Sequence, residues 1–155
     1  MSTAEKNTPT VLIKKALSKD EVHACLAIRM KVFVHGQGVP LHEEQDGKDE
    51  ESDHYLLLLD NKPVGTARVR YCIDVAKIER VAILEGHQGL GLGKAIMSEV
   101  LSELRANPTV SVAKLGAQTY AIPFYEKLGF IVCSEEYMDA GILHRDMHVC
   151  LKETI

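Results

Sequence analysis

The chain has 155 residues, of which 46% are hydrophobic and 26% are charged, and its formal net charge is -4. These values are those of an ordinary globular protein, and we expect a single domain over residues 1–155. The acidic balance disfavours a nucleic acid partner, because no basic excess is available for a phosphate backbone, and no apolar run reaches the ~20 residues that span a membrane.

The N-terminal third predicts a strand, a helix and an acidic loop. Val11–Leu17 has the pattern of a strand and is followed by Ser18-Lys-Asp-Glu21, a capping box in which the serine and glutamate side chains each satisfy a free backbone amide. The apolar spacing beyond it predicts a helix to about Val34, ended by Gly36. Val39–Asp53 is acidic and rich in turn residues, which favours a solvated loop suited to attract a cationic amine.

The rest of the chain predicts six strands and two helices. The first strand candidates are His54–Leu59, Val64–Ile73 and Ala76–Leu84, each bounded by turn residues. Leu92–Leu104 predicts a helix because its leucine, isoleucine and valine side chains recur at four-residue spacing. The C-terminal elements are a strand, a short helix and two more strands, at Ser111–Leu115, Ile122–Lys127, Phe130–Ser134 and His144–Leu151. This order of elements indicates one mixed α/β domain.

The most informative segment is a glycine loop between a strand and the long helix. Glycines alternate at Gly89, Gly91 and Gly93, where the absence of side chains lets successive backbone N–H groups converge on one anion. The helix that starts there adds its free amides and the positive end of its dipole, and Lys94 adds a charge. The loop therefore predicts a pyrophosphate site, and a tight turn without a ligand is the alternative.

Two other phosphate-binding motifs do not fit the loop. A Walker A motif requires glycine where Gln88 lies, and serine or threonine where Ala95 lies. The dinucleotide-binding fingerprint requires a third glycine where Lys94 lies. A nucleotide-binding P-loop protein is therefore disfavoured.

Two motifs resemble those of the GNAT superfamily of N-acetyltransferases. Gln88, Gly91 and Gly93 fit the pattern Gln/Arg-x-x-Gly-x-Gly/Ala, which resembles motif A of that family. Leu115–Phe130, which contains Pro-Phe-Tyr-Glu-Lys-Leu-Gly-Phe, resembles motif B and follows at the family's separation of one helix and one strand. The Leu-Gly-Ala-Gln at its start and Asp-Ala-Gly-Ile-Leu-His at 139–144 are similar to the ElaA/YjcF branch.

The resemblance implies a fold, a reaction and a co-substrate. The fold is the GNAT acyl-CoA N-acyltransferase fold, in which helices flank a mixed, mostly antiparallel sheet that splays between its fourth and fifth strands. The reaction is direct transfer of the acetyl group of acetyl-CoA to a primary amine of a small molecule or peptide. A non-catalytic acyl-CoA-binding regulatory module is the alternative. The partners are acetyl-CoA and the amine, and an exposed edge of the last strand would suit a homodimer.

The resemblance also assigns the residues that hold coenzyme A. The pantetheine arm enters the splay and bonds to the fourth strand at Val81 and Ile83, and Gln118 stands where the family often has an asparagine that binds the same arm. The pyrophosphate lies on the glycine loop, which comprises Gln88, Gly89, Leu90, Gly91, Leu92, Gly93 and Lys94.

Tyr125 is the residue that the resemblance assigns to proton donation. It matches the motif B tyrosine that faces the sulfur of coenzyme A, so it is both a cofactor-binding residue and the general acid for the departing thiolate. The alternative is a core aromatic residue that clusters with Phe124, Leu128 and Phe130.

Glu79 is the residue assigned as general base, acting through a water molecule as in several family members. Burial near apolar neighbours would raise the pKa of its carboxyl toward the working range. Strand alternation puts Glu79, Val81 and Ile83 on one face of the sheet. The alternative is a cross-strand ion pair of Glu79 with Arg68 or Arg70.

Two histidines are further candidates for the base, and no metal is expected. His54 and His144 qualify because imidazole titrates near neutral pH. The acidic loop does not fit the EF-hand pattern, because Gly47 directly follows Asp46.

The N-terminus and the cysteines indicate the compartment. Met1–Thr10 is polar and lacks the apolar segment of a secretory signal. Cys25, Cys72, Cys133 and Cys150 are widely spaced, which is typical of small buried residues in a reducing compartment rather than of a disulfide framework or a zinc site. We therefore expect a cytoplasmic protein, with the nucleus as the alternative.

Overall fold

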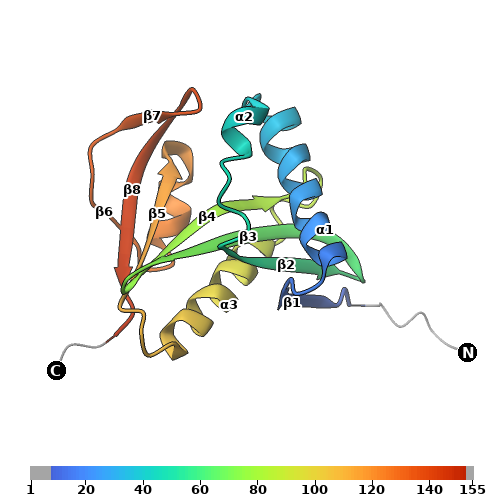
Figure 1. Cartoon of the computed structure of the whole chain (residues 1–155), viewed down its shortest axis with the longest axis horizontal. Helices are drawn as coiled ribbons and strands as arrows, with labels where there is room; N and C mark the ends of the chain where they lie inside the picture. The colour runs from blue at the N-terminus through green and yellow to red at the C-terminus, as the bar shows by residue number, and fades with distance from the viewer. Residues whose placement is uncertain (1–7, 153–155) are drawn as a thin grey trace, which may run out of the picture.

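The computed structural model describes residues 8–152 and shows a twisted sheet with helices on both faces (Figure 1). The sheet has eight strands in the order β1-β2-β3-β4-β5-β8-β6, and β7 pairs with β8 beside β6. All pairs are antiparallel except β4 with β5. The expected mixed and mostly antiparallel sheet is confirmed. Residues 1–7, most of the polar Met1–Thr10 segment, lie outside the described residues.

The first elements follow the predicted order. The capping box is present, because Glu21 N donates to Ser18 Oγ at 3.1 Å and Ser18 N donates to Glu21 Oε1 at 3.1 Å. The predicted single helix continues past Val34, but its second part is wound as a π-helix. The elements are β1 (Val11–Lys15), α1 (Lys19–Arg29), the π-helix η1 (Met30–Gly36) and the short α2 (Leu41–Glu44).

Apart from a short 3-10 helix at Thr119–Ala121, which no pattern predicted, the remaining strands and helices occur where the sequence patterns predicted them, with one added strand. They are β2 (Asp53–Leu59), β3 (Lys62–Cys72), β4 (Val75–Ile83), α3 (Leu92–Ala106), β5 (Val112–Gln118), the 3-10 helix η2 (Thr119–Ala121), α4 (Ile122–Glu126), β6 (Ile131–Val132), β7 (Tyr137–Asp139) and β8 (Ile142–Cys150). The addition is β7, which forms a hairpin with β8 through Ala140 and Gly141, both at positive φ.

The hairpin corrects the expectation of an exposed edge on the last strand. β8 pairs with β5 along one side, while β6 and β7 fold back and pair with it along the other. The last strand is therefore interior over most of its length.

The core has a large part under α3 and a small part under α1. α3 buries one face that includes Ile96 and Val100 against the sheet, and α1 buries Cys25 and Ile28 on the opposite face. Cys25 is the one buried cysteine of the four, because the other three lie at or just beyond strand ends, which corrects the expectation of four buried thiols. In the part of the chain that the structure describes, no helix is long and apolar enough to cross a membrane.

The sheet opens between β4 and β5, as the resemblance implied. The two strands pair only from Val75 to Lys77 and from Val112 to Lys114. Beyond these residues β4 continues beside β3, whereas β5 continues beside β8 as far as the pair Gln118 and His144. One edge of β4 is therefore left without a strand partner, and a wedge separates the two halves of the sheet.

A bulge at Arg80 overturns the expected alternation on β4. The register with β3 shifts so that two β4 residues, Arg80 and Val81, stand opposite a single residue, and Arg80 has a φ of 56°. Glu79 and Arg80 consequently both contact charged groups on the α1 side, whereas Val81 and Ile83 pack against the core under α3. Glu79 does not share a face with Val81 and Ile83, because the extra residue reverses the two-residue period.

Candidate functional site

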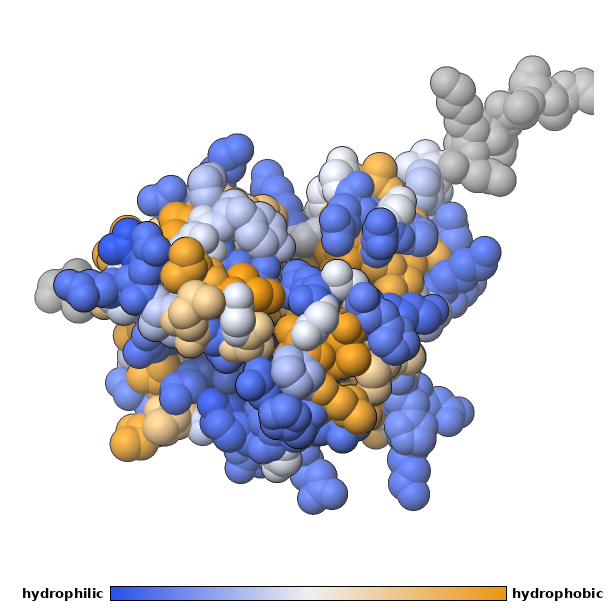
Figure 2. All heavy atoms as spheres, turned by 90° about the horizontal axis from the view of Figure 1, so that it is seen from above, coloured by the Kyte–Doolittle hydropathy of each residue, from blue (hydrophilic) through white to orange (hydrophobic). Residues whose placement is uncertain are grey.

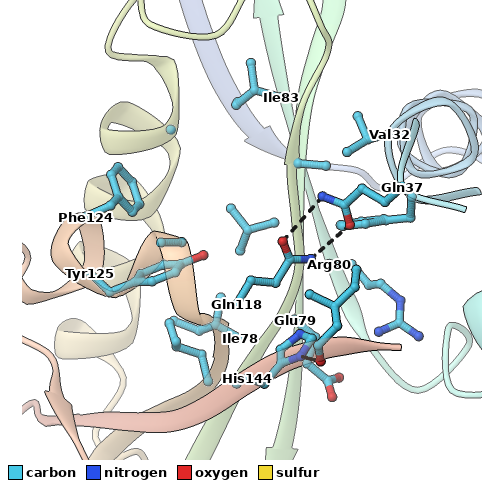
Figure 3. A pocket seen from close by; sticks show the side chains of 18 of the residues that line it. Val32, Gln37, Ile78, Glu79, Arg80, Ile83, Gln118, Phe124, Tyr125 and His144 are labelled. Carbon is cyan, nitrogen blue, oxygen red and sulfur yellow. Dashed lines mark hydrogen bonds between the residues drawn. The ribbon is translucent and has the colours of Figure 1, made fainter. Parts of the chain in front are cut away.

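A single cleft of about 880 Å³ runs through the wedge between β4 and β5. Its walls come from the end of η1, from β4 and β5, from the start of α3, from α4 and from β8 (Figure 3). Figure 2 looks onto the end of the molecule at which α2 and the β7–β8 hairpin lie, and it shows apolar surface among polar side chains. Apolar walls with a few polar groups are typical of a site for a small ligand.

The glycine loop forms one end of the cleft. Gly89 and Gly91 have φ values of 80° and 78°, which side chains other than glycine rarely adopt, and Gly91 caps the start of α3. At Gly93 a Cβ atom would lie 3.4 Å from Phe124 Cζ, so Gly93 places the start of α3 beside Phe124 of α4. The predicted strand–loop–helix geometry is confirmed, and binding of pyrophosphate by its amides stays a prediction.

The side chains of this loop differ in their surroundings. Leu92 is buried in the core, whereas Leu90 is exposed, and Lys94 is exposed at the rim of the cleft. Gln88 donates from Nε2 to the Ile83 carbonyl oxygen at 3.2 Å, which ties the loop to the end of β4. The backbone rather than these side chains is therefore what the loop offers to an anion.

Gln118, the predicted pantetheine ligand, is paired with a residue that the sequence did not point to. Gln118 Nε2 donates to Gln37 Oε1 at 2.9 Å, and Gln37 Nε2 donates back at 3.5 Å. Gln118 ends β5 and Gln37 follows η1, so the two amides bridge the cleft (Figure 3). No local pattern marked Gln37, because its partner is distant in the sequence.

Tyr125 has its ring in the core and its hydroxyl in the cleft. The ring packs edge-on against Phe124 and Phe130, with centroid distances of 5.0 and 6.0 Å. Burial raises the pKa of Tyr125 to about 12. The hydroxyl points into the cleft (Figure 3), and it makes no hydrogen bond with the residues that the structure describes. The ring of Tyr125 therefore fits the role of a core aromatic residue, while its hydroxyl has the position that a proton donor needs.

Glu79 makes the ion pairs that were its alternative role. Its Oε1 atom accepts from Arg68 Nη2 at 2.9 Å and from Arg70 Nε at 2.7 Å. Burial alone would raise the pKa of the Glu79 carboxyl, but the hydrogen bonds and charges of Arg70 and Arg68 outweigh it and hold the pKa below its ordinary value. The expectation of a raised pKa is therefore wrong, because the neighbours of the carboxylate are cations rather than apolar groups.

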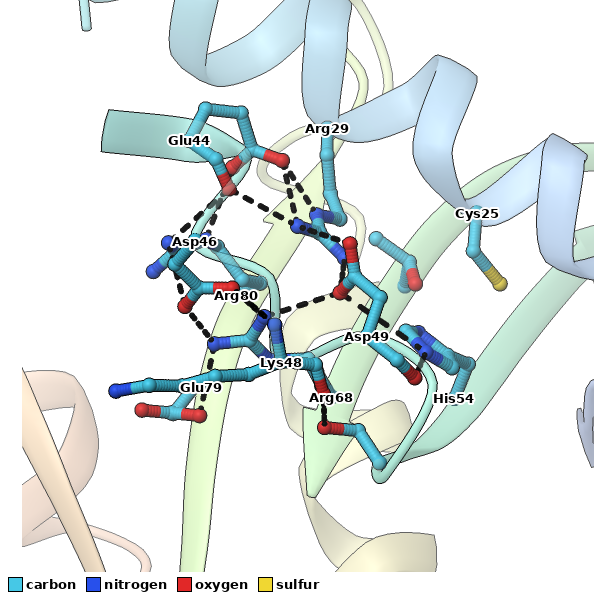
Figure 4. A network of polar contacts seen from close by, with 12 residues as sticks. Cys25, Arg29, Glu44, Asp46, Lys48, Asp49, His54, Arg68, Glu79 and Arg80 are labelled. Carbon is cyan, nitrogen blue, oxygen red and sulfur yellow. Dashed lines mark hydrogen bonds and ion pairs between the residues drawn. The ribbon is translucent and has the colours of Figure 1, made fainter. Parts of the chain in front are cut away.

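The acidic loop is held by arginines instead of lying free in solvent. Asp46 accepts from Arg68 Nη2 at 2.7 Å, and Asp49 lies 2.7 Å from Arg29 Nη1 and 3.0 Å from Arg68 Nη1 (Figure 4). Arg29 and Arg68 are both fully buried. Asp46 and Asp49 neutralise cations buried inside the protein, which corrects the expectation for these two carboxylates. Glu43, Glu50 and Glu51 are exposed as expected, and attraction of an amine by the loop stays a prediction.

Glu44 completes this arginine network and joins it to the cleft. Its carboxylate lies 2.6 Å from Arg29 Nη2 and 2.9 Å from Arg80 Nε, and its side chain is 5% exposed. Arg80 is the residue at the β4 bulge, so the loop is anchored where the wedge begins. No local sequence signal marked this network, because its arginines are spread over positions 29 to 80 of the chain.

The two candidate histidines occupy different places. His54 donates from Nε2 to the Asp49 carbonyl oxygen, 2.9 Å away, and it does not line the cleft. His144 lines the cleft and stacks on Tyr137, with ring centroids 5.8 Å apart. Among residues 8–152, no group of three or more histidine, cysteine, aspartate or glutamate side chains could hold a metal ion.

This architecture is similar to that of known proteins. The family model of the acetyltransferase (GNAT) domain matches residues 13–151. The Bacillus subtilis protein BSU40680, named as an acetyltransferase, is 42% identical over 135 residues, which cover 85% of this chain and 91% of the relative. The Bacillus subtilis N-acetyltransferase YjcF is 39% identical over 133 residues, which cover 85% of this chain and 94% of the relative. The crystal structure of Escherichia coli ElaA has a TM-score of 0.81 and 28% identity, and the match covers 90% of this chain and 99% of that chain.

Proposed function

The chain belongs to the GNAT acetyltransferase family, and we propose that it transfers the acetyl group of acetyl-CoA directly to a primary amine of a small molecule or peptide. The observation that carries the proposal is the cleft, which continues from the glycine loop through the wedge to the opposite face of the sheet. A thioester inside the wedge would be open to the cofactor from one side and to the amine from the other. Direct transfer needs this arrangement, because both reactants must reach one carbon atom.

The glycine loop and the open edge of β4 would hold coenzyme A. Gly89, Gly91 and the start of α3 line the end of the cleft, where their backbone amides would suit the pyrophosphate. The pantetheine arm would then take the place of a strand beside Val81 and Ile83, where β4 has no partner from β5. Gln118 would contribute its amide once its pairing with Gln37 is exchanged for the ligand.

Tyr125 would donate the proton to the departing thiolate. A hydroxyl with a pKa of about 12 stays protonated at neutral pH, as a donor must. Two aromatic contacts hold its ring while the hydroxyl faces the cleft without another protein partner among the described residues. Glu79 is better explained as the partner of Arg68 and Arg70 than as the base.

A test of the activity separates it from its alternative, a non-catalytic module that binds acyl-CoA. The protein is incubated with acetyl-CoA and, in turn, with spermidine, lysine methyl ester and the peptide Ala-Gly-Gly, while the release of free thiol is followed. Thiol release that depends on the amine supports the enzyme. Binding of CoA by calorimetry without such release would favour the module, and no binding of CoA would contradict both.

A further inference from the structure

We propose that His144 is the general base of the transfer and that its Nε2 atom takes the proton from the acceptor amine. The inference rests on the proposed amine acetylation and supplies the group that this reaction needs after Glu79 is committed to two arginines. It follows from the position of the imidazole, from its tautomer and from its neighbours.

The imidazole lies on the side of the sheet from which the amine would approach. β8 alternates, so that Met147 is buried in the core under α3 while His144 and Asp146 face the other way. His144 stands in register with Gln118 at the end of β5 and with Tyr137 on β7. The ring is therefore placed where the wedge is widest, at the level of the amide pair, and it is only 9% exposed (Figure 3).

The hydrogen bond of the ring determines its tautomer. His144 Nδ1 lies 2.7 Å from the Ile142 carbonyl oxygen, and a carbonyl oxygen can only accept. Nδ1 must therefore carry the hydrogen, which leaves the lone pair of the neutral ring on Nε2. None of the hydrogen bonds within residues 8–152 uses Nε2, so this atom is available to a ligand in the cleft.

Packing holds the plane of the ring. Tyr137 stacks on His144 with an interplanar angle of 20°, and its hydroxyl donates to Asp146 Oδ1 at 2.6 Å. A Cβ atom at Gly116 would lie 2.5 Å from the Tyr137 hydroxyl, so the missing side chain of β5 makes room for this stack. The imidazole is thus orientated by two contacts that do not occupy Nε2.

The charges around the ring are largely neutralised by one another. No ion pair among the described residues includes His144, whereas Glu79 is paired with Arg70 and Asp146 lies 3.7 Å from Lys114 Nζ. The titratable or charged side chains that line the cleft from the strands around His144 are Arg70 from β3, Lys77, Glu79 and Arg80 from β4, Lys114 from β5, Tyr137 and Asp139 from β7, and Asp146 from β8.

The proton balance of the reaction is complete with two residues. The amine nitrogen forms a bond with the thioester carbonyl carbon, and its surplus proton moves to His144 Nε2. The bond between carbon and sulfur then breaks, and the thiolate takes the hydroxyl proton of Tyr125. The imidazolium and the tyrosinate return to their starting forms by exchange with water, so the products are the amide and free coenzyme A.

His144→Asn is the informative variant, because its amide nitrogen can still donate to the Ile142 carbonyl oxygen while the lone pair of Nε2 is lost. We expect kcat to fall about 10²–10⁴-fold. The decline of kcat at acid pH that protonation of the base causes should disappear, and the affinity for CoA should stay unchanged. His148→Asn is the matched control, since it lies on the same strand and face four residues away, and its kcat should stay at the wild-type value.

Rescue and spectroscopy separate a base from a structural histidine. Imidazole added to His144→Ala should restore part of the lost rate, which it would not do if the ring only supported the fold. In ¹⁵N-histidine spectra of the wild-type protein at high pH, His144 should show hydrogen on Nδ1 and a free Nε2. The opposite tautomer would overturn the proposal even if no acceptor had been identified.

The outcomes also distinguish this proposal from the one on which it rests. A wild-type protein that releases no thiol with any of the three amines contradicts amine acetylation. A wild-type protein that turns over, together with a His144→Asn variant of equal kcat and unchanged pH profile, contradicts only the role of His144.

Discussion

Gln37 and Gln118 exchange side-chain hydrogen bonds across the cleft, at 2.9 Å in one direction and 3.5 Å in the other. Gln37 directly follows η1 and Gln118 ends β5, and these two elements share no backbone pairing. Both amides line the cleft that the glycine loop and His144 also line, so in the proposed binding mode a cofactor would take the place of one amide contact.

This relationship predicts different effects for the two glutamines. Gln118→Ala should weaken CoA binding about 2–10-fold, because the ligand loses one hydrogen bond of about 0.5–1.5 kcal/mol. Gln37→Ala should leave the Kd for CoA unchanged or lower, since it frees Gln118 without removing it. Calorimetry with CoA measures both, and an unaltered Kd for Gln118→Ala would contradict the contact.

Gly91→Asp should abolish CoA binding within the range of calorimetry. The substitution adds a negative charge where the pyrophosphate is expected and a side chain where φ is 78°. Gly91→Ala is the matched control, because it introduces the same backbone strain without the charge and should lose less affinity. If the aspartate variant is folded by circular dichroism and binds CoA as the wild type does, the loop is not the phosphate site.

Tyr125→Phe should lower kcat about 10²–10⁴-fold and leave the melting temperature and CoA affinity nearly unchanged. Only the hydroxyl is removed, so the edge-on contacts with Phe124 and Phe130 remain. Since its pKa is about 12, Tyr125 should not contribute a fall in rate below about pH 10. Tyr120→Phe, at an exposed position that also lines the cleft, serves as the control. A wild-type kcat for Tyr125→Phe would leave this residue with a packing role alone.

Glu79→Gln should reduce stability while kcat and the acidic limb of its pH profile are kept. The amide cannot replace the charged hydrogen bonds to Arg68 and Arg70, which predicts a loss of about 1–3 kcal/mol in the free energy of unfolding. Denaturant unfolding and steady-state kinetics measure the two effects. Glu51→Gln, whose partner Arg70 is 3.8 Å away and whose side chain is 65% exposed, should change neither.

The stability of the wild type should in turn fall in acid. In the folded protein burial alone would raise the pKa values of Glu79, Asp46 and Asp49, but arginine partners hold all three below their ordinary values. The unfolded state therefore binds more protons, and the stabilisation is present above the ordinary carboxyl pKa of about 4 and is lost as pH falls through the folded values. Melting temperatures should decline below about pH 4, and less steeply for Glu79→Gln. A melting temperature independent of pH in this range would contradict the network.

Much of the fold was predictable because it depends on neighbouring residues. The capping box at Ser18 and the helix that starts after Gly91 involve groups only a few positions apart, and both formed as expected. The glycine loop was recognisable for the same reason, since positive φ at Gly89 is a local property. The family resemblance added the splay between β4 and β5, which no local pattern contains.

The sequence by itself determined most of the elements, their order and the glycine loop, whereas the tertiary structure decided which side chains meet in the cleft. Glu79 and Val81 lie on opposite faces of β4, although strand alternation predicts the same face. The extra residue at the Arg80 bulge is the reason, because it shifts the alternation of side chains by one position. The ion pairs of the acidic loop were not expected from the sequence, because their arginines, such as Arg29 and Arg68, are distant from the loop along the chain. His144 and Gln37 gained their places in the cleft in the same way, because contacts between separate elements depend on how the sheet opens and not on neighbouring residues.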